Sequence, residues 1–292
     1  MNTEMTEAGA AAIQEEWTEI IEPQHSLLDL RLAEVWNYRD LLLLLVRRDF
    51  VATYKQTILG PIWFFLQPVL TTLTFTLIFG KIAGLSTDGM PMLLFYMAGI
   101  TLWNYFSECL NRTATVFKDN ESVFGKVYFP RLIMPLSIVV SNLIKLGIQF
   151  FLFLLFWGFY LFTGSSVHPN AAILLTPVLV LIMGGLGLGF GMIISALTTK
   201  YRDLVFLMTF GVQLLMYATP VIYPLSSISD KYKMLIMVNP MTSIIETFRY
   251  AFMGSGSLNW GALAYSAFFM IIIMVTGTIV FNKVEKSFMD TV

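Results

Sequence analysis

Six apolar segments, each long enough to cross a membrane, constrain the fold of this 292-residue chain more than any other feature. A spanning helix needs about 20 mostly apolar residues, because the hydrocarbon core is about 30 Å thick and each helical residue rises about 1.5 Å. We therefore predict an all-α membrane protein with six transmembrane helices, near residues 62–84, 92–111, 133–163, 171–197, 204–223 and 261–282. The third segment is longer than a bilayer requires, so it should tilt or project into the cytoplasm.

The composition agrees with a membrane protein and restricts the ligands and partners that we expect. Hydrophobic residues make up 57% of the chain and charged residues 13%, whereas soluble domains carry about 25% charged residues. The net charge of −1 gives no reason to expect a nucleic-acid partner. The single cysteine, Cys109, excludes an internal disulfide framework and a cysteine-based metal site. His25 and His168 stand far apart without ligand-spaced partners, so we predict no metal site.

The distribution of charge sets the expected topology. The first thirty residues are acidic and lack the apolar core of a signal peptide, so the N-terminus should stay in the cytoplasm. Most Lys and Arg residues fall in loops on that same side. An even number of spans then returns the C-terminus to the cytoplasm. The resulting division is a cytoplasmic arm (1–30), an interfacial helix region (31–60), a six-span domain (61–284) and a cytoplasmic tail (285–292).

Shorter apolar stretches lie outside the six spans. The leucine run 41–45 is too short to cross, and arginines flank it. Arginine on one side and leucine on another predict an amphipathic helix that lies in the interface plane before the first span. Residues 224–260 contain two apolar stretches split by Asn239-Pro240. These predict re-entrant or interfacial helices between the fifth and sixth spans, which membrane depth tolerates only against protein or a water-filled cavity.

Polar and aromatic residues recur at helical spacing in the first and fifth predicted spans. They are Trp63, Gln67, Thr71 and Thr74 in the first span, and Thr209, Gln213, Tyr217 and Pro220 in the fifth, with Tyr223 at its outer end. A glutamine in hydrocarbon needs a hydrogen-bond partner, so both faces should point away from lipid. Two interpretations remain open: packing between helices, or a translocation path in which Trp and Tyr stack against sugar rings.

Three other features have a structural and a functional interpretation. The glycines of the fourth span, from Gly184 to Gly191, lie inside an apolar helix and predict close helix packing instead of a phosphate loop. Glu108 and Lys145 should form a structural ion pair between the second and third spans, because a proton relay needs more carboxylates. The loop 112–131 alternates charges with aromatics, which suits either docking onto a partner or an interfacial anchor.

Motifs for catalysis are missing from the sequence. It has no Gly-x-x-x-x-Gly-Lys-[Ser/Thr] loop, so another subunit must supply any ATP hydrolysis. It also lacks His-Glu-x-x-His and Gly-x-Ser-x-Gly. We therefore predict that the chain is not an enzyme and holds no cofactor of its own, with ATP and magnesium bound by a partner.

Five motifs follow the order of one known family along the chain. They are Arg48-Asp49-Phe50-Val51-Ala52-Thr53-Tyr54-Lys55-Gln56-Thr57-Ile58-Leu59-Gly60-Pro61-Ile62-Trp63 with Gln67-Pro68, then Phe129-Pro130-Arg131-Leu132-Ile133-Met134-Pro135, Tyr201-Arg202-Asp203, Thr219-Pro220-Val221-Ile222-Tyr223 and Asn239-Pro240. The chain resembles the membrane subunits of ABC exporters for O-antigen, capsule and teichoic acid. The resemblance spans residue 40 to the C-terminus, and it assigns no role to the acidic arm.

The resemblance implies an inner-membrane homodimer of six-span subunits, each resting on a separate ATP-hydrolysing subunit and together exporting a polyprenyl-linked polysaccharide. The polar faces of the first and fifth spans would line the channel. The resemblance also assigns Glu121, Phe124 and Tyr128 to an ATPase coupling helix, Arg202 and Asp203 to a second ATPase contact, Arg47, Arg48 and Tyr54 to an interfacial gate helix, and Glu246 and Arg249 to an outer rim.

Two other function classes compete with this interpretation. One is an ABC exporter of similar architecture that moves a drug or a small lipid. The other is a membrane glycosyltransferase or polymerase, which would need acidic residues at an aqueous face; such carboxylates are scarce in the spans. A purely structural scaffold would have no need of polar faces on two separate spans.

Overall fold

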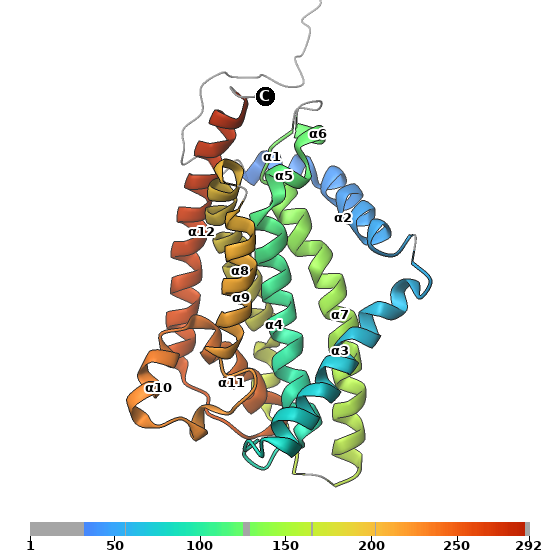
Figure 1. The fold of residues 1–292 in the computed structure, drawn as a ribbon, viewed down its shortest axis with the longest axis vertical. Coiled ribbons are helices and arrows are strands. Elements are labelled where there is room, and N and C mark those ends of the chain that lie inside the picture. The colour runs from blue at the N-terminus through green and yellow to red at the C-terminus, as the bar shows by residue number, and fades with distance from the viewer. Residues whose placement is uncertain (1–31, 56, 125–128, 165, 202, 290–292) are drawn as a thin grey trace, which may run out of the picture.

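The computed structural model is an elongated helical bundle, and the regular elements in its described part are helices (Figure 1). The described residues are 32–55, 57–124, 129–164, 166–201 and 203–289. The predicted all-α fold class is therefore confirmed for this part of the chain.

Within the described residues, four helical segments are long and apolar enough to cross a membrane. They are Gly60–Ile82, which joins η1 (Gly60–Ile62), α3 (Trp63–Phe75) and the π-helical η2 (Thr76–Ile82); α7 (Ile133–Phe162); Ala171–Lys200, which joins η3 (Ala171–Leu175) and α8 (Thr176–Lys200); and Trp260–Val284 of α12 (Trp260–Met289). These segments match the first, third, fourth and sixth predicted spans.

The second and fifth predicted spans form helices that do not meet the same criterion. Helix α4 (Met92–Ala114) has the length, but Asn104, Glu108 and Arg112 lower its hydropathy, and most of its residues are buried by other helices. Helix α9 (Leu204–Tyr217) is apolar but only 14 residues long. It ends before Pro220, which lacks an N–H and disfavours helical backbone at the preceding residue. Six spans thus remain a prediction.

Glycines let α8 sit between α4 and α12 at close range. An added Cβ at Gly187 would lie 2.7 Å from the Cβ of Cys109, and one at Gly191 would lie 2.5 Å from the Cβ of Thr113, both on α4. On the opposite side of α8, a Cβ at Gly189 would lie 2.8 Å from a side-chain methyl group of Ile273 on α12. The predicted close packing is confirmed, and it fixes the centre of the bundle.

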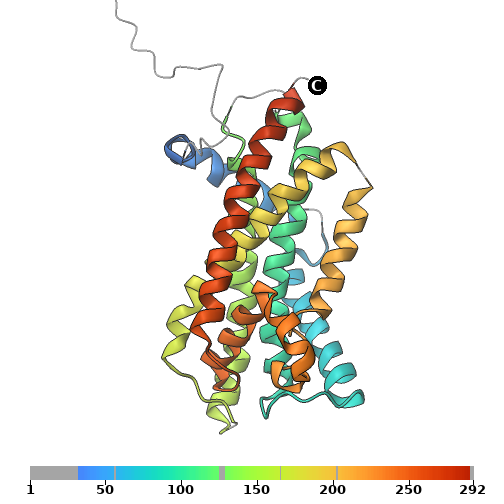
Figure 2. The same ribbon diagram turned by 90° about the vertical axis from the view of Figure 1, so that its left-hand side faces the viewer.

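Short helices occupy the two ends of the bundle (Figures 1 and 2). One end carries α1 (Leu32–Asn37), α2 (Arg39–Tyr54), α5 (Val116–Asp119) and α6 (Glu121–Phe124). The opposite end carries η4 (Leu225–Ser227), α10 (Asp230–Met237) and α11 (Pro240–Met253). Both short helices predicted within 224–260 therefore exist. Most of α11 is buried against α4, α8 and α12, while α10 has no fully buried residue.

Helix α2 departs from the predicted separation of leucine and arginine. Leu45, Val46 and Asp49 form its buried face, which packs on α7. The exposed face carries Leu43 and Leu44, followed one turn later by Arg47 and Arg48. The predicted placement of Arg on one side and Leu on another is wrong, because the leucine run encircles the helix and α7 covers only part of it.

Candidate functional site

The polar face of α3 points away from the rest of the chain. Trp63 is 47% exposed, Gln67 and Thr74 are also exposed, and Thr71 is half-buried. The opposite side of the helix carries the buried residues Pro68 and Thr72. The Thr71 hydroxyl donates to the Gln67 carbonyl at 2.9 Å, so the helix itself satisfies it.

The polar face of α9 is exposed in the same way. Thr209, Gln213 and Tyr217 are exposed, whereas Met208 and Val212 pack against the bundle. Tyr223, just beyond the helix, is half-buried, and its hydroxyl donates to the Tyr217 carbonyl at 2.9 Å. Pro220, which the spacing placed on this face, is instead buried beneath α11.

The exposure of both polar faces argues against the first interpretation, in which they pack between helices of the same chain. Gln67 and Gln213 are not enclosed between helices of this chain, although an amide in a membrane needs polar partners. Helices α3 and α9 both pack against α4, and they lie toward the same side of the molecule, at the right of Figure 2. A second copy of the chain or a water-filled path would satisfy both faces.

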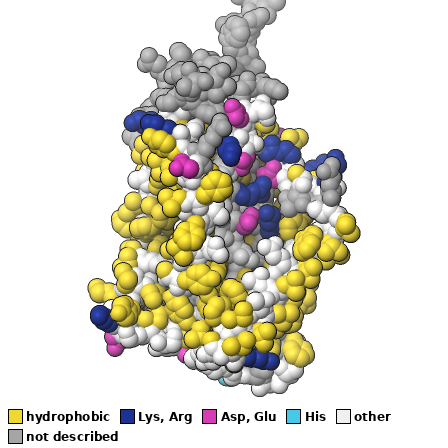
Figure 3. All heavy atoms as spheres, in the orientation of Figure 1, with side chains coloured by type: hydrophobic (Ala, Val, Ile, Leu, Met, Phe, Trp, Pro, Cys, Tyr) yellow, Lys and Arg dark blue, Asp and Glu magenta, His cyan; other side chains and the backbone are white. Residues whose placement is uncertain are grey.

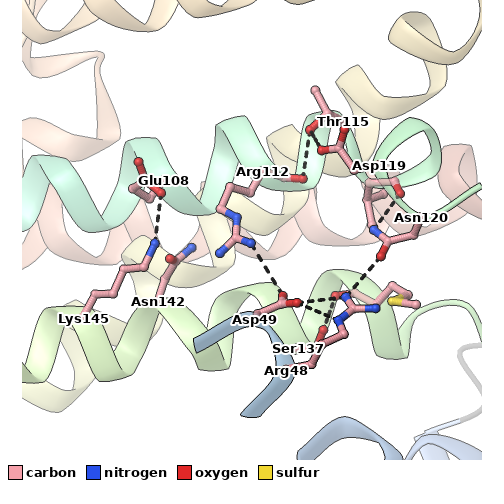
Figure 4. Close-up of polar contacts among 12 residues, drawn as sticks. Arg48, Asp49, Glu108, Arg112, Thr115, Asp119, Asn120, Ser137, Asn142 and Lys145 are labelled. Atoms are coloured by element: carbon pink, nitrogen blue, oxygen red, sulfur yellow. Dashed lines mark hydrogen bonds and ion pairs between the residues drawn. The ribbon is translucent and has the colours of Figure 1, made fainter. Parts of the chain in front are cut away.

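A strip of polar residues runs between α4 and α7 (Figure 4). The Lys145 ammonium lies 3.5 Å from the Glu108 carboxylate, so the predicted ion pair is confirmed. Asn142, one turn from Lys145, is buried and donates to the Cys109 sulfur at 3.7 Å. Figure 3 shows charged side chains gathered on this face of the molecule, in its upper half over α2 and the upper part of α4.

A charged network joins α2 to α4 and to the end of α5 (Figure 4). The buried Asp49 carboxylate accepts two hydrogen bonds from Arg48, at 2.8 and 3.0 Å, and lies 3.6 Å from Arg112 of α4. Arg48 also donates to the Asn120 side-chain oxygen at 3.2 Å, between α5 and α6. Asp49, Arg112 and Asn120 are site residues that the sequence interpretation missed. The sequence feature that could have revealed these residues is Asp49 itself, a carboxylate that lies four residues after Leu45 on the buried face of α2.

The predicted ATPase-contact residues fall at this same end of the bundle, where the structure describes them. Glu121 of α6 is exposed, and Asp203 is exposed at the start of α9. Arg47, which the resemblance assigns to the gate helix, is exposed on α2. The side chains of Phe124 and Tyr54, and the whole of Tyr128 and Arg202, lie outside the described residues.

Arg249 fastens α11 to the end of α9 at the opposite end of the molecule. Its guanidinium is buried and donates to the carbonyls of Pro220 and Val221, at 2.6 and 2.7 Å. The guanidinium carbon lies 3.6 Å from the Phe95 ring centroid, and the group lies 3.7 Å from the Glu246 carboxylate. Both side chains are buried, and α11, which carries them, lies at this end of the bundle. The outer rim that the resemblance assigns to these helices stays a prediction.

Membrane-length helices with exposed polar faces define a polytopic membrane protein. The sequence model of the ABC-2 type transporter family matches residues 40–253, and the chain belongs to this family.

Its relatives include O-antigen export system permease proteins RfbA. The protein from Myxococcus xanthus is 28% identical over 89% of this chain and 98% of its own length. One from Klebsiella pneumoniae is 27% identical over 86% of this chain and 94% of its own length. The polysialic acid transport protein KpsM of Escherichia coli is 22% identical over 84% of this chain and 93% of its own length.

Proposed function

We propose that this chain is the transmembrane subunit of an ATP-driven exporter that moves a lipid-linked polysaccharide across the cytoplasmic membrane. Membership in the ABC-2 type transporter family supports the transport class. The relatives that match over most of their length are named as O-antigen and polysialic acid transport proteins, which supports a polysaccharide as cargo. The exposed Trp63, Gln67, Gln213 and Tyr217 are the structural observation that carries the proposal, because aromatic rings and amides are suited to stacking on sugars and bonding their hydroxyl groups.

The active unit in this proposal is a homodimer with six spans per subunit and both termini in the cytoplasm. Helix α4 needs less apolar surface than a lipid-facing span, because neighbouring helices bury most of it. Helix α9 and the turn after it would complete the fifth span. The polar faces of α3 and α9 would then meet the second copy around the path, with Thr71, Thr74, Thr209 and Tyr223 beside the four residues named above.

Energy would come from a separate ABC ATPase subunit that holds ATP and magnesium. Its contact would include Glu121, Phe124 and Tyr128, together with Arg202 and Asp203. Closure of two ATPase subunits would push on α5 and α6, and the bond between Arg48 and Asn120 offers a route from there to α2. Helices α3 and α9 of the two copies would part to admit the glycolipid.

The lipid headgroup would meet the exposed side of α2. Arg47 is exposed there, and arginine offers paired donors to a pyrophosphate. Arg48 already bonds Asp49 and Asn120, so Arg47 is the better candidate of the two for this contact. Tyr54, near the end of α2, would complete this gate region.

The proposal is tested with the chain and its ATPase in inverted membrane vesicles that are supplied with lipid-linked polysaccharide. We expect ATP-dependent delivery of the polysaccharide into the vesicle lumen, and stimulation of the ATPase by the glycolipid but not by drugs. Stimulation by drugs alone would favour the drug-exporter alternative. Sugar transfer by the purified chain without an ATPase would favour a glycosyltransferase.

The aromatic lining has its own test. Trp63→Ala and Tyr217→Ala should each reduce surface polysaccharide in cells while leaving assembly with the ATPase intact, because both side chains are about half exposed, at 47% and 48%. The exposed Phe268→Ala on α12 is the matched aromatic control and should export normally. Normal export by both test variants would exclude an aromatic-lined path.

A further inference from the structure

A polar pocket lies deep in the wall between α4 and α7. Asn104 and Glu108 line it from α4, and Asn142, Lys145 and Gln149 line it from α7. Lys145 is the thirteenth residue of the 30-residue α7, which places it roughly 18 Å along the helix from its first residue. The pocket therefore lies within the spanning part of α7 instead of at its end.

The exposure and charge of the ion pair favour a polar environment for this wall over hydrocarbon. The Glu108 side chain is 49% exposed, whereas that of Lys145 is 17% exposed. A charged side chain in the middle of a spanning helix is strongly unfavourable when lipid surrounds it. The open carboxylate therefore faces water or a polar ligand.

The side-chain oxygen of a buried amide in the pocket also lacks a partner. Asn142 is 1% exposed, and no donor in the described part of the chain bonds its side-chain oxygen. Leaving such a buried acceptor unpaired destabilises the fold, because the oxygen has lost its bonds to water without gaining a protein donor. The cavity beside it measures about 20 Å³, which is close to the space that one water molecule or one hydroxyl group fills.

The charges of the pocket select an uncharged ligand. Glu108 and Lys145 cancel each other, and the amides of Asn104, Asn142 and Gln149 can both donate and accept. A phosphate would meet the Glu108 carboxylate, whereas a sugar hydroxyl can donate to Glu108 or Asn142 and accept from Lys145. Helices α3 and α9 both pack against α4, the helix that carries Asn104 and Glu108 of the pocket.

We propose that the α4–α7 pocket is a binding site for hydroxyl groups of an uncharged sugar residue in the transported glycan. This inference rests on the proposed function and deepens it. It adds Asn104, Glu108, Asn142, Lys145 and Gln149 to the wall of the path. The pair then has two roles, because it joins two helices and presents alternating donors and acceptors to the cargo.

Paired substitutions separate a binding site from a structural ion pair. Replacement of such a pair by apolar residues of similar volume is often neutral for stability. Glu108→Met with Lys145→Met should therefore assemble with the ATPase, yet deliver lipid-linked polysaccharide about tenfold more slowly. Glu108→Gln with Lys145→Gln retains hydrogen bonding and should keep most of the delivery rate. Delivery at the wild-type rate by the Met pair would overturn the inference.

The assay uses inverted vesicles and lipid-linked polysaccharide extracted from the membranes of the source cell. Gln149→Leu is the second variant, and it should also slow delivery several-fold. If the Met pair fails to assemble, wild-type delivery by Gln149→Leu overturns the inference instead. Thr276→Val on α12 removes an exposed hydroxyl elsewhere and should change nothing. A wild-type complex that delivers no polysaccharide contradicts the proposed function and this site together, whereas an unimpaired variant contradicts the site alone.

Discussion

Helices α8 and α9 follow each other in the chain but are held in opposite ways. Helix α8 contacts α4 and α12 so closely that Gly187, Gly189 and Gly191 leave no room for a Cβ. Helix α9 touches the bundle mainly through Met208 and Val212. Apolar cavities of about 360 and 320 Å³ lie beside it, both lined in part by Phe106, Phe190 and Leu215.

The difference indicates that α8 belongs to a fixed core, whereas α9 can move relative to it. Close backbone contacts allow few alternative packings, because interiors at crystal-like density tolerate little change in volume. A helix attached along one stripe, next to open space, can shift with small loss of contact. The exposed polar face of α9 belongs to this loosely held element, as does that of α3, whose spanning segment is the least buried of the four.

The largest expected effect comes from filling the tight contact on α8. Gly191→Leu should prevent stable folding, because its Cβ would lie 2.5 Å from the Thr113 Cβ and 3.0 Å from the Leu110 carbonyl oxygen. Overpacking of this kind costs about 3 kcal/mol or more. The matched control is Gly211→Leu on α9, where no atom lies within 4 Å of an added Cβ. Size-exclusion profiles of the purified variants measure the outcome. Equal profiles for the two variants would contradict the difference in packing between α8 and α9.

The next effect concerns the segment after α9, which Arg249 joins to α11. Arg249→Met should lower the free energy of unfolding by about 3 kcal/mol, because it leaves Glu246 and two carbonyls without their buried partner. Thermal unfolding in detergent measures it. The exposed Lys231→Met on α10 serves as the control and should melt like the wild type. An unchanged melting temperature for Arg249→Met would show that the outer end of α9 does not depend on this residue.

The smallest effect on stability should come from the exposed polar faces. Gln67→Leu combined with Gln213→Leu should melt within a degree or two of the wild type, because neither amide is buried in the chain. Export should nevertheless fall several-fold if these amides line the path. Leu70→Ala with Leu214→Ala changes neighbouring exposed residues without altering polarity. A double glutamine variant that unfolds would place the amides in the packed interior instead.

The sequence predicts the packed part of this molecule well and the polar part incompletely. Helical periodicity, apolar length and the glycines of α8 report contacts along one helix, and the helices at 60–82, 133–162, 171–200 and 260–284 follow them. The hydrogen bonds from Arg249 to the carbonyls of Pro220 and Val221 were missed, because these partners lie far from Arg249 in the chain. Asp49 was missed for the same reason, since Arg112 reaches it, and Asn120 reaches its partner Arg48, only after folding.

The direct test of the account is whether the exposed face of α9 meets a second copy of the chain. The single native cysteine, Cys109, is buried, so a Cys109→Ser background allows single-site labelling. In native membranes, Gln213→Cys should yield a cross-linked dimer with a short bifunctional thiol reagent, whereas Phe268→Cys on α12 should remain a monomer. Cross-linking through Phe268→Cys and none through Gln213→Cys would contradict the placement of the polar faces around a shared path.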